Sequence, residues 1–212
     1  MRLQEARRDL YRRLAKEQGY KSRAAFKLIE ADEKYGIIRE GDRVVDFGAA
    51  PGGWLQVCSK LAGPEGLVVG LDLQEIRVKG ENIETVVADV NAPGTLEKVL
   101  RLTGGKVDVV LSDLSPSVSG VWELDHIRQV DLTLKVLELC ESLLRRGGNA
   151  FFKLFEGERS QEGREALRRA FKTVRVVKPA ASRSASSELY YYCEGWTGGD
   201  IARSGHSLPK TA

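Results

Sequence analysis

Segments of continuous apolar residues alternate along the chain with segments in which apolar residues recur every three or four positions. Short apolar runs bounded by turn residues are typical of buried strands, and the wider spacing is typical of amphipathic helices. The pattern predicts strands over 43–49, 66–72, 83–89, 106–113, 149–155, 173–179 and 187–195. It predicts helices over 22–35, from 53 onward, and over 94–101, 124–145 and 160–170. We expect Ser22 to be the N-cap of the first of these helices and Gly36 to end it.

The order of these elements predicts the fold class. Strands that alternate with helices indicate a parallel sheet with helices on both faces. The last two strands are joined by about seven residues, which is too short for the crossover that two parallel strands need. We therefore expect an α/β fold with a seven-stranded, mostly parallel sheet, in which the last strand runs antiparallel to its neighbour.

The chain of 212 residues is long enough for one domain with small additions at its ends. We expect a basic N-terminal arm or helix over 1–20, the main domain over 21–195 and a flexible tail over 196–212. Neither a membrane-length apolar run nor the apolar region of a signal peptide is present, so we expect a cytoplasmic protein that does not enter membranes.

The cysteines and histidines do not indicate a metal site. Cys58, Cys140 and Cys193 are far apart and match no metal-ligand spacing, so we expect reduced thiols. The two histidines pair with no cysteine. We therefore expect no bound metal.

Charge is distributed unevenly along the chain, although the net charge is only +3. Residues 1–27 carry a net +6 and residues 145–183 a net +7, whereas residues 28–144 carry a net −9. If the fold brings the two basic segments together, they form a cationic surface suited to a phosphate backbone. Lysine and arginine also solvate ordinary helix surfaces, so charge alone leaves both interpretations open.

A glycine-rich loop, DFGAAPGGW at 46–54, joins the first predicted strand to the helix that follows. In doubly wound sheets this turn holds a nucleotide-like ligand, and glycines such as Gly52 and Gly53 let the backbone approach it closely. The loop lacks the GxGxxG spacing of pyrophosphate-binding proteins. This absence argues against a dehydrogenase of the Rossmann type.

Three aspartates end successive predicted strands: Asp72, Asp89 and Asp113. A ligand with ribose hydroxyls, an adenine amine and a cationic amino group could use all three carboxylates. S-adenosylmethionine fits this description, whereas clustered acids would repel the pyrophosphate of NAD. A single aspartate at such a position more often caps a helix, but three beside a glycine-rich loop favour the ligand.

Lys153 lies inside the apolar run FFKLF at 151–155. A buried ammonium is costly unless it is paired or neutral. Taken alone, the segment favours a lysine near a strand end whose amine extends to water.

Five motifs, in this order along the chain, resemble one family: SRAAFKL, DFGAAPGGW, SDLSP, FFKLFEG and KPAASRSASSELY. They are similar to those of the FtsJ/RrmJ family of S-adenosylmethionine-dependent RNA ribose 2′-O-methyltransferases, in particular its RlmE-type members from archaea. The resemblance covers about Tyr20 to Glu194. It implies the Rossmann-like, seven-stranded methyltransferase fold and makes 21–195 the catalytic domain. One departure is Leu114-Ser115, where bacterial members often have Met-Ala.

The resemblance also implies roles for individual residues. The family's catalytic tetrad falls on Lys27, Asp113, Lys153 and Glu188. Its contacts to S-adenosylmethionine fall on Gly52, Gly53, Trp54, Asp72 and Asp89, with Asp113 shared between the cofactor and catalysis.

The reaction explains why a lysine would be buried at position 153. A ribose hydroxyl is a poor nucleophile until its proton begins to leave, so a base must lie within hydrogen-bonding reach. Burial and the nearby cation Lys27 favour the neutral amine of Lys153, whereas Asp113 and Glu188 favour the ammonium. We favour Lys153 as the base. The alternative is a cation that orients the hydroxyl and stabilises the developing alkoxide.

The RNA would lie against the basic segments. The residues that we expect on that side are Arg7, Arg8, Arg12, Arg13, Arg168, Arg169, Lys178 and Arg183. The resemblance implies a uridine of the large-subunit (23S) ribosomal RNA as the target, within the assembled subunit, and a ribose in the tRNA anticodon loop as the alternative. We expect a monomer. A small-molecule methyltransferase would lack the tetrad and the basic segments, and a non-catalytic RNA-binding protein would have lost a tetrad residue.

Overall fold

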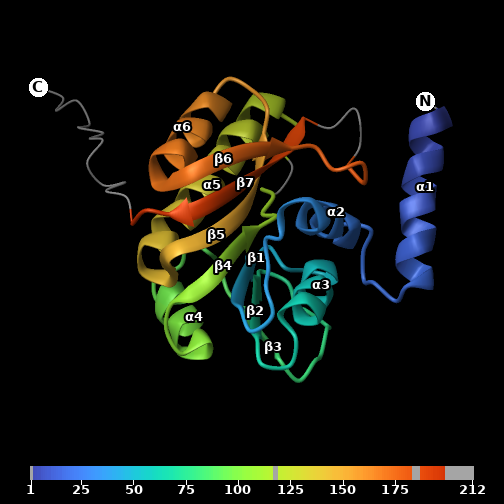
Figure 1. The fold of residues 1–212 in the computed structure, drawn as a ribbon. Coiled ribbons are helices and arrows are strands. Elements are labelled where there is room, and N and C mark those ends of the chain that lie inside the picture. Colours follow the sequence, from blue (N-terminus) through green and yellow to red (C-terminus); the bar gives the residue numbers. More distant parts are fainter. Residues whose placement is uncertain (1, 117–118, 183–186, 199–212) are drawn as a thin grey trace, which may run out of the picture.

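The computed structural model describes residues 2–116, 119–182 and 187–198, and its centre is one seven-stranded sheet (Figure 1). The strands are β1 (Arg43–Phe47), β2 (Leu67–Asp72), β3 (Ile83–Val87), β4 (Val107–Ser112), β5 (Leu144–Phe155), β6 (Phe171–Val177) and β7 (Glu188–Trp196). They lie in the order β3-β2-β1-β4-β5-β7-β6. The strands from β3 to β5 are parallel, and β7 is antiparallel to both β5 and β6. The prediction of a mostly parallel sheet with a reversed last strand is confirmed. The reversed strand lies inside the sheet, between β5 and β6.

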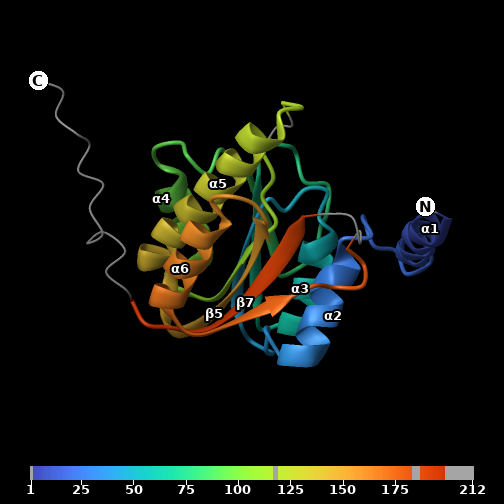
Figure 2. The ribbon, with the colours of Figure 1, turned by 90° about the horizontal axis from the view of Figure 1, so that it is seen from above.

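Helices cover both faces of the sheet, as Figure 2 shows from above. The helices are α1 (Arg2–Glu17), α2 (Ala25–Tyr35), α3 (Gly53–Ala62), α4 (Thr95–Thr103), α5 (Trp122–Leu143) and α6 (Ser160–Ala170). α2 and α3 lie on one face, and α4, α5 and α6 lie on the other. None of the helices in the described residues has the length and apolarity needed to cross a membrane.

The central strands are apolar on both sides because each face packs against helices. Along β1, Val44 belongs to the cluster beneath α2 and α3, whereas Val45 and Phe47 belong to the cluster beneath α4 to α6. All three side chains are fully buried. The three cysteines are also buried and free, which confirms the expectation of reduced thiols.

Two predicted element boundaries are wrong. Ser22 is not the N-cap of the first predicted helix: α2 begins at Ala25, and no side chain caps it. Ser22 lies so close to Gly53 that a Cβ built on that glycine would be 2.5 Å from its Oγ. β5 begins at Leu144, directly after α5, because the chain turns from helix into strand without a loop. The predicted end of α2 at Gly36, a left-handed C-cap, is confirmed.

The predicted flexible tail, 196–212, begins one residue too early. β7 extends to Trp196, which is 1% exposed and packs edge-on against Phe171 at 5.1 Å. Most of the predicted tail, 199–212, lies outside the described residues, so the tail stays a prediction.

The basic segments do not all meet on one side. α1 packs against α2 and the segment after β6 through the cluster Ala15, Phe26 and Ala181. α6 runs back along the far face of the sheet, so Arg168 and Arg169 in its last turn lie at the edge where β6 begins. The tetrad lies at the opposite edge, so the prediction that these two arginines face the RNA is wrong. Lys178 does lie at the tetrad's edge, directly after β6. The side chains of Arg7 and Arg8, and residue Arg183, lie outside what the structure describes.

Candidate active site

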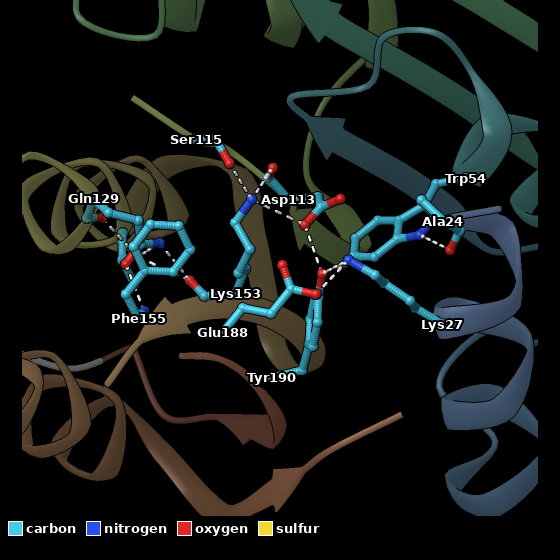
Figure 3. A network of polar contacts seen from close by, with 11 residues as sticks. Ala24, Lys27, Trp54, Asp113, Ser115, Gln129, Lys153, Phe155, Glu188 and Tyr190 are labelled. Atoms are coloured by element: carbon cyan, nitrogen blue, oxygen red, sulfur yellow. Dashed lines mark hydrogen bonds and ion pairs between the residues drawn. The ribbon is translucent and has the colours of Figure 1, made fainter. Parts of the chain in front are cut away.

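The four residues of the predicted tetrad come from four parts of the fold and meet at the carboxyl edge of the parallel strands. Asp113 follows β4, Lys153 lies near the end of β5, Glu188 begins β7, and Lys27 is on α2. The antiparallel register pairs Lys153 with Tyr190 on β7, and Phe155 with Glu188. Figure 3 shows the two lysines approaching from opposite sides, with the acids and the tyrosine between them.

Each lysine makes an ion pair with one of the acids. Lys153 Nζ is 3.1 Å from Asp113 Oδ1, and Lys27 Nζ is 2.7 Å from Glu188 Oε1. The side chains of the two lysines are only 4% and 9% exposed. The sequence prediction that an apolar strand surrounds a paired lysine agrees with this geometry, and Lys153 does not extend to open water.

Tyr190 connects the two ion pairs, a role that the sequence analysis missed. Its hydroxyl accepts a hydrogen bond from Lys27 Nζ at 2.7 Å and donates one to Asp113 Oδ1 at 2.8 Å. The ring stacks on Phe151 at 5.0 Å and is fully buried. The available signal was spacing, because Tyr190 lies two positions after Glu188 on the same strand and therefore points to the same face.

Ser115 is a second residue that the sequence analysis did not place in the site. Lys153 Nζ donates to Ser115 Oγ and to the backbone carbonyl of Asp113, the latter at 2.7 Å. Together with the Asp113 carboxylate, these are three acceptors around one amine. An ammonium has three protons to donate, so this arrangement matches the charged form of Lys153.

The local charges act on Asp113 and Tyr190 in opposite directions. Burial would raise the pKa of Asp113, but the charges of Lys153 and Lys27 and the hydrogen bond from Tyr190 outweigh it, and the pKa lies below its usual value. For Tyr190, burial first and then the charges of Asp113 and Glu188 raise the pKa well above its usual value. Asp113 is therefore an anion and Tyr190 a neutral phenol over the physiological range.

A glutamine from the far face of the sheet holds the end of β5. β4 pairs with β5 only as far as Ser112 and Phe152, so the backbone beyond Phe152 lacks a partner on that strand. Gln129 on α5 replaces it. Its Nε2 donates to the Lys153 carbonyl at 2.8 Å, and its Oε1 accepts from the Phe155 amide at 2.9 Å. This clamp fixes the backbone directly after the lysine, from the Lys153 carbonyl to the Phe155 amide.

Two cavities flank the segment from Asp113 to Pro116. The first, about 340 Å³, is lined by Asp72, Asp89 and Asp131, by Arg128, and by apolar side chains. The second, about 210 Å³, is lined by Asp113, Lys27 and the backbone of the glycine-rich loop. The three strand-end aspartates do lie along one edge, as predicted, but they divide between two neighbouring spaces.

The carboxylates of the first cavity also organise the loops that carry them. Asp72 accepts from the amide of Ala50 at 3.0 Å and from the amide of Gln74 at 2.9 Å. Asp89 accepts from the amide of Asn91 at 2.8 Å. Each acid thus has oxygens near a cavity and a fixed orientation, which suits binding of hydroxyl or amine donors.

The glycine-rich loop is shaped by contacts within the protein. Gly52 has φ +104°, and a Cβ there would lie 2.2 Å from Val78 Cγ2. Gly53 lies against Ser22 and also lines the second cavity. At Gly52 the close neighbour in the structure is Val78, and the contact of Gly52 with the cofactor stays a prediction.

Trp54 combines packing with a place beside the second cavity. It is 3% exposed, its Nε1 donates to the Ala24 carbonyl at 2.8 Å, and its ring packs against Phe151 and Tyr190. It also lines the cavity next to Gly53. The tryptophan thus joins α3 to the start of α2 and holds the loop in position.

Comparisons with known proteins agree with the geometry. Residues 20–196 match the family model of FtsJ-like methyltransferases. A ribosomal RNA large subunit methyltransferase E from Nitrosopumilus maritimus is 43% identical over 198 residues, which are 93% of this chain and 100% of that protein. The enzyme of the same name from Methanothermobacter thermautotrophicus is 46% identical over 189 residues, which are 88% of this chain and 89% of that one.

Two solved structures extend the comparison to the fold. A candidate ribosomal RNA methyltransferase from Plasmodium falciparum has a TM-score of 0.73 and 26% identity, covering 84% of this chain and 98% of that chain. Aeropyrum pernix fibrillarin, with S-adenosylmethionine bound, has a TM-score of 0.55 and 18% identity, covering 80% and 75%. The second likeness concerns the fold alone. The matched residues 20–196 include all seven strands, and the tetrad residues meet at the strand ends. The chain therefore belongs to the FtsJ-like methyltransferase family.

Proposed function

We propose that this protein transfers a methyl group from S-adenosylmethionine to a ribose 2′-hydroxyl of ribosomal RNA, with a uridine of the large-subunit (23S) RNA in the assembled subunit as the target. The assembled set of Lys27, Asp113, Lys153 and Glu188 beside the cavities is the observation that carries the proposal. The names of the relatives at 43% and 46% identity support large-subunit ribosomal RNA as the substrate.

The two cavities suit the two halves of the methyl donor. The apolar side chains of the first cavity match an adenine ring, and Asp72 and Asp89 would bind the ribose hydroxyls and the amine of an adenosine. The second cavity, with Asp113 and the glycine-rich loop, suits the amino acid part. When bound, the donor supplies an electrophilic methyl group. Gly53 and Trp54 would form the wall on that side, and Gly52 would hold the loop.

The tetrad would then act on the ribose hydroxyl. Lys153 is held by the Asp113 carboxylate, the Asp113 carbonyl and Ser115, so its amine has a defined position beside two residues that line the cavities. We propose that the neutral amine takes the hydroxyl proton as the oxygen attacks. Lys27, paired with Glu188 at 2.7 Å, places a second cation opposite, where it stabilises the negative charge that develops on the oxygen.

Labelled methyl transfer from S-adenosylmethionine tests the proposed function. Purified protein is incubated separately with large ribosomal subunits, free large-subunit RNA and tRNA, and the labelled nucleotide is identified after digestion. We expect a 2′-O-methylated uridine in the large subunit. Transfer to tRNA in its place would move the substrate to the anticodon loop, and no transfer to any RNA would overturn the proposal.

The Lys153→Ala variant tests the role of the lysine under the same conditions. General base catalysis typically contributes about 10²–10⁴-fold, so we expect a fall of that size in single-turnover rate with unchanged binding of S-adenosylmethionine. Lys60→Ala, which removes a lysine on α3 remote from the tetrad, is the control. Wild-type rate in the Lys153→Ala variant would exclude a catalytic role for Lys153 and leave the methyltransferase activity standing.

A pH–rate profile separates the base from the orienting cation. The three acceptors around Lys153 match the ammonium, so the neutral amine must be formed before it can take a proton. If the neutral amine is the base, the single-turnover rate rises about tenfold per pH unit while the ammonium predominates. A rate that is flat or falls with pH would show that Lys153 acts as a cation.

A further inference from the structure

The first two turns of α5 expose a group of apolar side chains. These are Val121, Trp122, Leu124 and Ile127, which are 53%, 49%, 38% and 37% exposed. Trp122 is the largest of them. The other two tryptophans of the chain, Trp54 and Trp196, are only 3% and 1% exposed. The aliphatic members of this group offer no flat ring on which a base could stack, whereas the indole of Trp122 does.

Trp122 is held in a defined orientation by two other rings. Its ring is nearly parallel to that of Phe155, with centroids 5.9 Å apart and planes 16° apart, and to that of His126, at 6.2 Å and 19°. His126 is itself fixed, because its Nε2 accepts from the Arg159 amide at 3.1 Å. The backbone before the tryptophan is fixed by Asp125, which accepts from the Ser119 amide at 2.9 Å.

This aromatic surface begins at the catalytic lysine. Phe155 lies two residues after Lys153, and Lys153 Nζ is 5.8 Å from the centre of its ring (Figure 3). Trp122 extends the surface outward from Phe155. The half-exposed indole of Trp122 therefore lies directly beyond Phe155, whose ring is near the Lys153 amine. If the target nucleotide binds at Lys153, the indole is within reach of the next nucleotide along the RNA.

We propose that Trp122, backed by Phe155, forms a stacking platform for the base of the RNA nucleotide next to the methylated one. The inference rests on the proposed function, since it requires an RNA ribose at the tetrad. Proteins that bind unpaired RNA stack bases on aromatic side chains, and this contact tolerates any base because every base has a π-face. The platform thus positions the target ribose without reading sequence.

The charges around the platform indicate that it takes a base, with the phosphates passing elsewhere. Glu123 follows Trp122 and Glu156 follows Phe155, and both acids are exposed. The charge of Glu123 would repel a phosphate from the indole, whereas the charge of Glu156 is balanced by Arg164 at 3.1 Å. A neutral planar group can approach the indole without that cost.

The experiment compares two substitutions of Trp122 in the full-length protein. We expect Trp122→Leu to raise KM for large-subunit RNA about tenfold, since base stacking on an aromatic side chain is a contact of that size. Trp122→Phe keeps a ring and should stay within about twofold of the wild type. Leu124→Ala, on the same exposed turns, is the matched control and should leave KM unchanged. Affinity for S-adenosylmethionine and the thermal melting temperature check that the fold is intact.

Tryptophan fluorescence provides a readout that does not depend on catalysis. Addition of large-subunit RNA should quench the wild-type emission, and the Trp122→Phe variant, which keeps the two buried tryptophans, should lose that quenching. If the wild type methylates RNA but Trp122→Leu has the wild-type KM, the platform is excluded. An equal rise in KM in Leu124→Ala would also exclude it. Absence of any RNA methylation by the wild type would remove the proposed function and the platform together.

Discussion

At the scale of single residues, Ser115 holds the amine of Lys153, the proposed base, without adding a charge. Asp113 contributes one carboxylate oxygen and one carbonyl to Lys153, and the Ser115 hydroxyl is the third acceptor. Ser115 is exposed and lines the first cavity, so its substitution leaves the core intact. Its contribution is the direction in which the amine points.

We predict that Ser115→Ala lowers the single-turnover methylation rate about tenfold, because one hydrogen bond to a charged amine is lost. KM for RNA and affinity for S-adenosylmethionine should change little. Ser115→Thr keeps the hydroxyl and should restore most of the rate. Equal rates for the alanine variant and the wild type, measured at saturating RNA and cofactor, would show that the serine does not position Lys153.

Asp46 is a second residue whose chemistry follows from its surroundings. It lies on β1, is fully buried, and neither carboxylate oxygen has a hydrogen-bond partner among the described residues. Burial first, and then the charges of Asp113 and Asp72, raise the pKa of Asp46 well above its usual value. The folded protein therefore holds this carboxyl as the neutral acid, where an unpaired anion would be far more costly.

This raised pKa makes a prediction about stability and pH. The folded state binds the Asp46 proton more tightly than the unfolded chain, whose carboxyl titrates near 3.8. The contribution of Asp46 to stability is therefore complete below that pH and is lost as pH rises through the folded pKa. Asp46→Asn removes this loss. At pH 8 the Asp46→Asn variant should therefore be more stable than the wild type. Each unit by which the folded pKa of Asp46 exceeds the unfolded pKa, counted up to pH 8, adds about 1.4 kcal/mol to this difference.

Urea denaturation at pH 5 and at pH 8 measures the difference. The free energy of unfolding of the wild type should fall relative to that of the asparagine variant between these two values. Parallel pH dependences of the two proteins would show that Asp46 is ionised in the folded state.

At the scale of elements, the loop between β1 and α3 is shaped by the segment that follows β2. Gly52 has φ +104° and lies directly against Val78, so the loop and that segment pack without a side chain between them. The same loop supplies Gly53 and Trp54 to the second cavity. A change at Gly52 should therefore reach the second cavity, the proposed cofactor site, through the backbone.

We predict that Gly52→Ala destabilises the protein by about 2–4 kcal/mol, from backbone strain and from the clash with Val78. Gly41→Ala is the matched control. Its φ of +82° is also left-handed, but a Cβ there would meet nothing within 4 Å, so only the strain of about 1–2 kcal/mol applies. Chemical denaturation of both variants measures the difference. Equal losses would mean that the neighbourhood of Val78 yields to the added methyl group.

The elements that the sequence predicted well are those determined by a local pattern. Strands β1, β2 and β4 are apolar because both of their faces are buried, and the short link before β7 limits it to an antiparallel pairing. The family resemblance of their motifs, and not a local pattern, placed Lys153 and Asp113 in one site.

The features that escaped prediction depend on contacts distant in sequence. The start of α2 is set by the packing of Ser22 against Gly53. Gln129 replaces missing strand pairing across the sheet, and nothing in its local sequence indicates that role. Tyr190 joins the two ion pairs only because α2 brings Lys27 over β7. Tertiary arrangement decides each of these.

At the scale of the whole molecule, the fold separates the basic segments that the sequence placed together. α1 lies beside α2, at the edge that carries the tetrad, and Lys178 lies directly after β6 at the same edge. Arg168 and Arg169 lie at the other edge of the sheet. RNA bound at the tetrad can therefore reach the first group, whereas the second lies an entire strand length away.

This separation supplies a test with its own control. We predict that the double variant Arg12→Ala/Arg13→Ala weakens RNA binding, because both side chains are exposed on α1 and can meet phosphates. The double variant Arg168→Ala/Arg169→Ala removes the same net charge. It therefore measures how much a general loss of positive charge weakens RNA binding. The comparison of the two double variants isolates position from charge.

The measurement is KM for large-subunit RNA over a series of salt concentrations. Each phosphate contact with single-stranded RNA contributes about 0.7 to the slope of log affinity against log salt. Loss of two contacts should therefore reduce the slope of the α1 variant by about 1.4, while the α6 variant keeps the wild-type slope. Because the two variants have equal net charge, an equal change in both would mean that the RNA responds only to overall charge. A change in the α6 variant alone would place the RNA on the opposite edge of the sheet.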